Sequence, residues 1–307
     1  MSRCLVYLAL IVGVCPSAWS QLKIQAVVNA ASFQPGVPDV GGLVSIFVSG
    51  LAGTPGLHTA SSALPLPSTL AGIIVTVNGL PAPILAVYIP PQGQSAYGQI
   101  NIQVPIEWNT SASTGQDKVV VSQQSSSGGV LLDSFGLVVV VPRWGGFFSD
   151  QNGFAIAQHA ADYSTVTSQN PAHAGETILV YATGFFRVWP PSPVGFPAPQ
   201  QPLFLSTDPI PMNTGYLFLQ SAPQAIGPGP GGAFLSGSCA DTPAVQVTFE
   251  GLAPGLVGVE QINFVVPANQ QPGDWTLFFN TGTSADGKTC DALHSPSSSP
   301  YVKLPVR

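Results

Sequence analysis

Short apolar runs separated by Gly, Pro, Asn and Ser recur along the whole chain. Val, Ile, Phe and Thr are frequent in these runs, and apolar and polar residues tend to alternate, as in half-buried β-strands. Glu occurs only four times, and no long stretch places apolar residues at the spacing of an amphipathic helix. The sequence therefore predicts an all-β protein, with the clearest strands at residues 43–49, 73–78, 84–89, 99–104, 118–122, 137–141, 177–182, 245–250, 261–266, 275–280 and 301–306.

Three sequence blocks of the first half recur in the same order in the second half. The pairs are residues 97–105 with 259–267 (YGQINIQVP and VEQINFVVP), 45–51 with 179–185 (SIFVSGL and LVYATGF), and 75–80 with 247–252 (VTVNGL and VTFEGL). Their unequal offsets predict an insertion after Gly184 and a loss of about ten residues before the second Gln-Ile-Asn block.

The chain is therefore predicted to contain two copies of one β-sandwich domain. The copies span residues 21–144 and 145–307, and each is large enough to form its own hydrophobic core. The second copy carries a Pro/Gly-rich insertion at about residues 187–242.

The Gln-Ile-Asn block has a two-sided pattern. Alternation places Ile100 and Ile102 on one face of the strand and Gln99 and Asn101 on the other. We expect these amides to form hydrogen bonds between strands or in a turn; a ligand platform is the alternative.

Further residues carry a resemblance to a known family. They are residues 28–33 (VNAASF), 42–52 (GLVSIFVSGLA), 64–67 (LPLP) and 75–79 (VTVNG), and in the second half residues 170–172 (NPA), 174–177 (AGET), 181–184 (YATG) and 251–258 (GLAPGLVG). With these motifs the chain resembles the secreted C-terminal β-domain family of Solibacter-type acidobacteria. The resemblance implies two tandem immunoglobulin-like β-sandwich domains, similar to the IPT/TIG type, and export from the cell; it implies no activity. The chain departs from the usual Asn-Gln-Asp-Gly turn of the family at residues 158–162 (QHAAD).

The N-terminus has the pattern of a secretory signal peptide. Arg3 precedes an apolar stretch at residues 5–14, and a small-residue triplet ends at Ser20, near which cleavage is predicted. The apolar stretch is shorter than the roughly 20 residues of a membrane span, so no span is predicted. We expect a secreted or cell-surface protein, in which Cys239 and Cys290 form a disulfide.

Composition restricts the classes of partner. Charged residues make up 7% of the chain, against about 25% in an ordinary domain. With 8 Lys and Arg against 14 Asp and Glu, the formal net charge is −6, which excludes sequence-independent binding to nucleic acid. Because 45% of residues are hydrophobic, the abundant Gly and Pro do not indicate wholesale disorder.

Candidate catalytic chemistry is sparse. No nucleophile elbow, zinc-protease motif, phosphate loop or dinucleotide motif occurs, so no catalytic residue, metal or cofactor is predicted. One alternative is a secreted hydrolase or metal-dependent enzyme that uses His159 and His173, which lie near Asp162 and Glu176 at the start of the second copy.

Aromatic residues give the better candidate site. Phe185, Phe186, Trp189 and Phe196 follow the second Thr-Gly, in and around the predicted insertion, where they could stack on sugars or anchor a partner protein. The alternative is that they seal the contact between the domains and pin the insertion. The sequence thus predicts a non-enzymatic extracellular protein for adhesion, with a glycan or cell-surface protein as its partner. A purely structural spacer is the third alternative.

Overall fold

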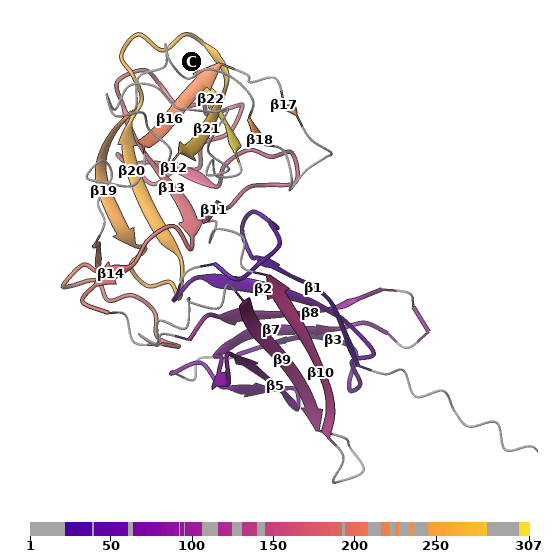
Figure 1. Cartoon of the computed structure of the whole chain (residues 1–307). Helices are drawn as coiled ribbons and strands as arrows, with labels where there is room; N and C mark the ends of the chain where they lie inside the picture. The colour runs from indigo at the N-terminus through magenta and orange to yellow at the C-terminus, as the bar shows by residue number, and fades with distance from the viewer. Residues whose placement is uncertain are drawn as a thin grey trace, which may run out of the picture.

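The computed structural model of the chain describes residues 22–38, 40–60, 64–91, 93–94, 96–105, 116–124, 131–139, 145–191, 194–207, 216–221, 225–226, 234–235, 245–280 and 301–307. These residues form strands and no helix, so the all-β prediction is confirmed (Figure 1). Across the described part of the chain, no helix has the length and apolar character that crossing a membrane requires. The predicted signal peptide and both cysteines of the predicted disulfide lie outside the described residues.

The first half of the chain forms two antiparallel sheets. One has the order β1 (Lys23–Asn29), β2 (Leu43–Ser49), β8 (Gly98–Gln103), β7 (Ile84–Ile89) and β3 (Gly56–Thr59). The other has the order β10 (Leu131–Val139), β9 (Gln116–Gln124), β5 (Ile73–Val77) and β4 (Thr69–Leu70), with β6 (Leu80–Pro81) beside β5. Inward side chains of both sheets, among them Ile46, Val75, Ile100 and Val121, form one buried cluster, which makes the arrangement sandwich-like.

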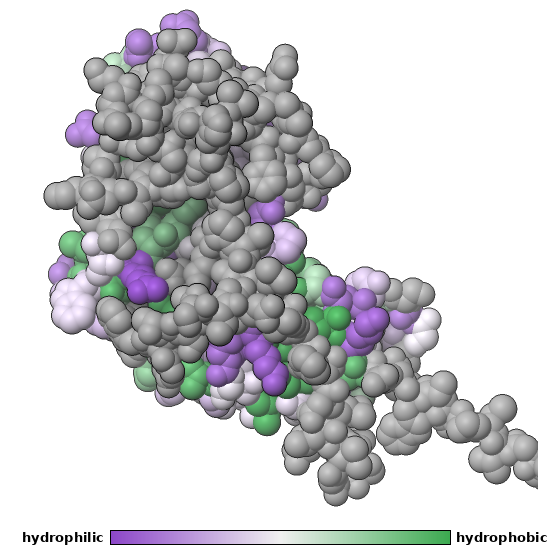
Figure 2. All heavy atoms as spheres, in the orientation of Figure 1, coloured by the Kyte–Doolittle hydropathy of each residue, from purple (hydrophilic) through white to green (hydrophobic). Residues whose placement is uncertain are grey.

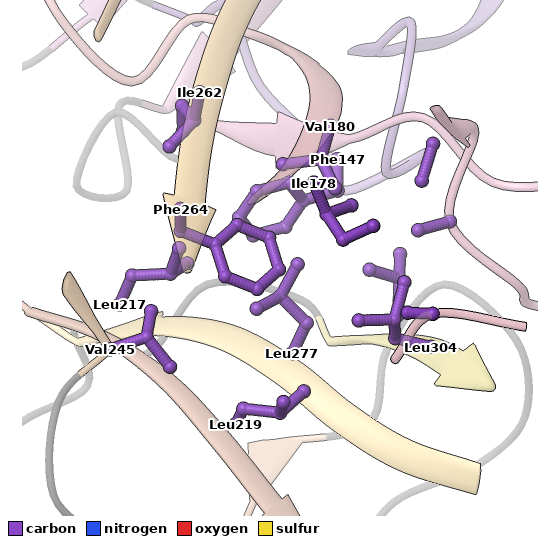
Figure 3. Close-up of a cluster of buried hydrophobic side chains, with 14 of the residues drawn as sticks. Phe147, Ile178, Val180, Leu217, Leu219, Val245, Ile262, Phe264, Leu277 and Leu304 are labelled. Carbon is purple, nitrogen blue, oxygen red and sulfur yellow. The ribbon is translucent and has the colours of Figure 1, made fainter. Parts of the chain in front are cut away.

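The second half has a sheet of seven strands. Its order is β11 (Gly146–Phe147), β13 (Thr177–Thr183), β20 (Glu260–Val265), β19 (Gln246–Leu252), β15 (Leu205–Ser206) and β14 (Val188–Trp189), with β12 (Ala157–His159) also paired to β13. A second sheet joins β16 (Tyr216–Ser221), β21 (Gly273–Asn280) and β22 (Val302–Val306), and β17 (Ala225–Ile226) pairs with β18 (Phe234–Leu235). Phe147, Ile178, Phe264, Leu277 and Leu304 belong to a separate core between these sheets (Figure 3).

Each of the eleven predicted strands overlaps an observed strand. The strands that were not predicted are β1, β3, β4, β6, β11, β12, β14, β15, β16, β17 and β18. All but β1 and β16 have two to four residues, which are too few for alternation to be visible; β1 (Lys23–Asn29) and β16 (Tyr216–Ser221) are longer and were missed. The domain boundaries stay a prediction, since the residues around 140–144 lie outside the described part.

The strand register confirms two of the three repeated blocks. In the first half Val48 of β2 lies opposite Gly98 of β8; in the second half Ala182 of β13 lies opposite Glu260 of β20. The pairs Ser45 with Asn101 and Leu179 with Asn263 follow in the same step. Positions 45–51 and 97–103 therefore match positions 179–185 and 259–265 in space.

The third predicted pairing is wrong. Residues 73–77 form β5 in the opposite sheet, whereas β19 pairs with β20. The true counterpart of β19 is β7: both strands pair with the Gln-Ile-Asn strand in one register, and both carry a β-bulge, between Ile84 and Ala86 and between Val247 and Phe249. A strand ending in Gly-Leu is too common a pattern to identify a repeat, and the predicted loss of ten residues disappears with the correction.

A fourth repeat escaped the sequence analysis. Residues 29–33 (NAASF) and 159–163 (HAADY) form the same turn, in which Phe33 N–H donates to Asn29 O and Tyr163 N–H donates to His159 O. Phe33 and Tyr163 both have positive φ, at 57° and 60°. The shared Ala-Ala dipeptide, flanked by an Asn or His and an aromatic residue, is the signal that would have revealed the repeat.

The two halves meet at a contact that we call the seam, formed by Thr183, Gly184 and Gly258 of the second half against Pro38 and Leu43 of the first. The Thr183 hydroxyl accepts from Leu43 N–H at 2.9 Å and donates to Gly258 O at 2.7 Å. A Cβ at Gly184 would lie 2.4 Å from Pro38 Cβ, and one at Gly258 would lie 2.6 Å from Leu43 Cδ2. Only glycine allows this approach, so the halves are packed backbone to backbone.

Candidate ligand-binding surface

The chain leaves β13 at Gly184 and travels along the sheet edge to β15; we call residues 185–207 the excursion. Its start is held by Glu260, which is 3% exposed. The Glu260 carboxylate accepts from Phe185 N–H at 3.0 and 3.1 Å and from Phe186 N–H at 3.3 Å. A buried carboxyl group thus fixes the direction in which the excursion departs.

The protonation of Glu260 is set mainly by its burial. Loss of water raises the pKa of this carboxyl to about 8, against the opposing effect of the backbone N–H groups and with a further contribution from nearby Glu250. Glu250 is itself 8% exposed on the neighbouring strand. Near neutral pH the side chain is therefore divided between the acid and the carboxylate.

Two of the four predicted aromatic site residues belong to the core. Phe186 is 7% exposed, and Phe185 packs against Phe147 with ring centroids 4.9 Å apart. These two rings anchor the excursion to the second half, as the alternative to ligand binding anticipated.

Trp189 lies on the surface instead. It pairs with Leu205 across the two-stranded ladder of β14 and β15, and the two side chains are 64% and 49% exposed. The ladder is closed by Thr207 N–H, which donates to Arg187 O at 2.8 Å. The exposed indole of Trp189 is therefore carried by a backbone segment that regular strand pairing holds in place.

The ladder is docked on the large sheet at Gly251. Leu205 pairs with Gly251 of β19, and Leu252 N–H donates to Phe204 O at 2.9 Å. A Cβ on Gly251 would lie 2.4 Å from Phe204 O, so a larger residue would displace the ladder.

A small apolar cluster lies between the excursion and the sheet. Ala198, Phe204 and Leu252 are buried, and Val188 packs against them. The excursion also carries apolar side chains that are exposed; around β14, Figure 2 shows hydrophobic, intermediate and hydrophilic residues next to one another. Exposed with Trp189 and Leu205 are Phe196, Leu203 and, on the adjoining loop, Leu256, at 36%, 37% and 46%. We call these five residues the Trp189 surface.

The far end of the excursion is bound to the first half. Gly195 N–H donates to Gln103 Oε1 at 2.8 Å, and Leu66 N–H donates to Gly195 O at 2.7 Å. Phe196 follows directly, so the fourth predicted site residue is exposed where the excursion crosses between the halves.

The structure brings His159 and His173 together around Glu176, as the enzyme alternative requires. The two ring centroids lie 6.5 Å apart, and His159 Nδ1 is 3.1 Å from each oxygen of Glu176. His159 Nε2 lies 3.3 Å from Asn170 O. Both nitrogens of the buried ring thus face acceptors, which leaves no lone pair directed at a metal or substrate.

The surroundings favour the charged form of His159. Burial lowers the pKa of the imidazole, but the hydrogen bonds to Glu176 and Asn170 and the charges of Glu176 and Asp162 outweigh it, so the pKa lies above its ordinary value. His173 is largely exposed, with its Nδ1 3.8 Å from Glu176. Within the described ranges no three His, Cys, Asp or Glu side chains gather as a metal site. This arrangement pins three loops together by a buried ion pair.

The amides of the repeated block bond along their own strand, whereas hydrogen bonds between strands or in a turn were expected; one bond between strands is formed in addition, by Ser45. Gln99 Nε2 donates to Asn101 Oδ1 at 2.9 Å, and Gln261 Nε2 donates to Asn263 Oδ1 at the same distance. The Ser45 hydroxyl on the neighbouring strand also donates to Asn101 Oδ1, at 3.0 Å.

Sequence reasoning missed three positions that build the surface: Glu260, Gly251 and Leu205. The repeated block already aligns Gly98 with Glu260, but the role of the glutamate could not be inferred from it. Gly251 stands opposite Tyr88 only when β19 is aligned with β7. The sequence pattern could not indicate Leu205, because its strand, β15, has only two residues.

No protein-family model matches the chain, and no curated protein is similar to it in sequence. Among solved structures, it is similar to a Bacteroides ovatus mixed-linkage glucan utilization locus protein, SGBP-B, in complex with a mixed-linkage heptasaccharide, at 10% identity and a TM-score of 0.27. That match covers 94% of this chain and 60% of the other, so this chain spans less than two thirds of its length. A chimeric titin Z1Z2 carrying a decorin peptide matches at 11% identity and a TM-score of 0.17, over 92% and 98% of the two chains. At these scores neither similarity establishes a common fold.

Proposed function

We propose that this is an exported, non-catalytic protein that binds neutral glycans through the Trp189 surface. The observation that carries the proposal is the 64% exposed indole of Trp189, paired with Leu205 on a ladder that is fixed to the sheet. An exposed indole contributes little burial energy to the fold, and exposed apolar side chains that gather on one surface are typical of interaction sites.

The chemistry of the surface favours sugar over other ligands. A pyranose ring has an apolar face of C–H groups, which stacks on the electron-rich face of an indole. Phe196, Leu203 and Leu256 add apolar area without adding charge. A chain with 7% charged residues is poorly suited to attract a polyanion, so neutral polysaccharides are the class of choice.

Preorganisation supports the same conclusion. The ladder closes through backbone hydrogen bonds, and its inner side packs on Phe204 and Leu252. A ligand would therefore lose little free energy to ordering of the surface.

The test is affinity electrophoresis of the purified protein against neutral polysaccharides (cellulose derivatives, xylan, galactomannan), with alginate as the anionic counterpart. We expect retardation by a neutral polymer, which Trp189→Ala abolishes or weakens by about tenfold, a loss of about 1.4 kcal/mol. Ile156→Ala is the matched control, because Ile156 is also exposed, at 42%, and lies outside the surface. Unchanged retardation of Trp189→Ala, or retardation by alginate alone, would refute the assignment.

A further inference from the structure

A second surface lies on the outer face of the first five-stranded sheet. In register across four strands stand Leu57 of β3, Tyr88 of β7, Gln99 of β8 and Phe47 of β2. Leu57 is 67% and Tyr88 38% exposed, whereas the alternate residues Ile46, Val87 and Ile100 are in the core. We call this row, with Ser45 and Asn101 beside it, the Tyr88 face.

The Tyr88 face combines aromatic rings with fixed amides. Tyr88 and Phe47 stand on either side of the Gln99 strand, about 10 Å apart, which is twice the spacing of neighbouring strands. Phe33 extends the aromatic area, with its ring centroid 6.5 Å from that of Phe47 and 52% of the residue exposed.

The amides are oriented by one another. Gln99 Nε2 donates to Asn101 Oδ1 at 2.9 Å and to the Ser45 hydroxyl at 3.4 Å, and this hydroxyl donates to Asn101 Oδ1. Among the described residues, Gln99 Oε1 and Asn101 Nδ2 have no hydrogen-bond partner. Gln99 thus offers an acceptor between Tyr88 and Phe47, and Asn101 offers a donor at the next outward position, between Ala86 and Ser45. Such a combination suits the hydroxyl groups and C–H faces of a sugar.

The charge pattern restricts the occupant. The outward positions of these four strands carry no charged side chain. Exposed or half-buried are Phe47, Ser49, Leu57, Thr59, Ala86, Tyr88, Gln99 and Asn101, whereas Ser45 and Gln103 are buried. An uncharged surface with polar groups locked in place complements a neutral, hydroxyl-rich ligand and offers nothing to an ionic one.

We propose that the Tyr88 face is a second binding site for neutral polysaccharide, separate from the Trp189 surface. The ligand class rests on the proposed function, whereas the site rests on residues of the other half of the chain. Because the two surfaces share no residue, their contributions should be independent.

The test is calorimetric titration of the purified protein with a short neutral oligosaccharide from the polymer that binds best. We expect two sites in the wild type, one site in Tyr88→Ala and in Trp189→Ala, and none in the double variant. Gln99→Ala should weaken the Tyr88 site about tenfold. Its matched control is Gln261→Ala, which removes the same amide pair from the second half and should leave both sites unchanged.

The outcomes separate the two proposals. If Tyr88→Ala retains the wild-type stoichiometry and Trp189→Ala loses binding, the second site is refuted and the proposed function stands. If only Tyr88→Ala loses binding, the Trp189 surface is refuted. A wild-type protein that dimerises with increasing concentration, and a Tyr88→Ala variant that stays monomeric, would overturn the inference by assigning the face to a second copy of the chain. Thermal unfolding of each variant verifies the fold, because the substituted side chains point out of the core.

Discussion

The two halves share one strand framework but use three equivalent positions differently. Position 98 is a glycine, and a Cβ there would lie 2.4 Å from Leu51, so the absence of a side chain leaves room for Leu51. The counterpart of Gly98 is Glu260, a buried glutamate that binds the backbone of the excursion. Position 88 is an exposed tyrosine, whereas its counterpart 251 is a glycine beneath Phe204 and Leu205. The third pair of equivalent positions is Leu51 and Phe185.

This difference explains how an insertion is accommodated without a new core. Glu260 holds the start of the excursion, and Gly251 lets the chain return to pair with β19 as the next strand of the sheet. The second half therefore presents its aromatic residue on the excursion, while the first half presents Tyr88 on the sheet itself. Equivalent faces became two different surfaces through changes at a few positions.

The largest difference in stability between equivalent substitutions is expected at the seam. Gly184→Ala should lower the free energy of unfolding by about 3 kcal/mol, because Ala is strained at a φ of 79° and its Cβ would clash with Pro38. Gly50→Ala is the matched variant, since Gly50 has a φ of 81° at the equivalent position. We expect a loss of only about 1 kcal/mol there. Urea unfolding gives both values, and equal losses would contradict the close packing at the seam.

Glu260→Ala should cost about 2–3 kcal/mol, since it leaves the Phe185 and Phe186 N–H groups without their acceptor. Glu260→Gln should retain much of the stability and remove a pH dependence. The folded pKa of about 8 lies above the ordinary 4.5, so the stabilising contribution is complete below about pH 4.5 and is lost as the pH rises through 8. Unfolding measured from pH 5 to 9 should decline more steeply in the wild type than in Glu260→Gln, and parallel profiles would contradict the assignment.

Gly251→Ala should destabilise the excursion by about 2 kcal/mol, because its Cβ would overlap Phe204 O. The reverse substitution, Tyr88→Gly, should cost about 1 kcal/mol or less, since Tyr88 is exposed and covers no excursion. Hydrogen exchange of Leu252 N–H, which donates to Phe204 O, reports the effect locally. Unaltered protection of this amide in Gly251→Ala would show that the ladder tolerates displacement.

His159→Asn places the residue of the equivalent position 29 in the second half. We expect a loss of about 1 kcal/mol at pH 5, where the imidazolium binds Glu176 and Asn170 O. Because the folded pKa is raised, the advantage of His159 is present below its ordinary value of 6.5 and is lost as the pH rises through the folded value. The stability difference between the two proteins should therefore shrink at pH 9, and a constant difference would argue against the ion pair.

Much of the fold could be predicted from the sequence because alternation reports directly on burial. Strands of five or more residues, such as β2, β8 and β20, carry enough positions for the pattern to be recognised. The order of the sheets was less accessible, as the confusion of β5 with β7 shows: two strands with similar composition lie in opposite sheets, and only pairing distinguishes them.

The candidate site was predictable in part. Trp189 and Phe196 are exposed, but composition cannot distinguish an exposed ring from Phe185 or Phe186, whose burial depends on Phe147 and Glu260 at distant positions. Tertiary contacts of this kind are absent from a local pattern. The repeated block aligns Gly98 with Glu260, but it does not show that the glutamate is buried or that it binds the Phe185 and Phe186 N–H groups.

The seam also restricts which matching positions of the two halves can differ in charge. Asn29, Ser32 and Gly42 in the first half lie at or beside the seam, and Asn29 Nδ2 donates to Thr183 O. Their counterparts His159, Asp162 and Glu176 lie at the opposite end of the second half, and two of the three now form an ion pair. Charged side chains are thus present at the end of the second half that lies away from the seam, and they are absent from the matching positions of the first half, which must pack closely against the second.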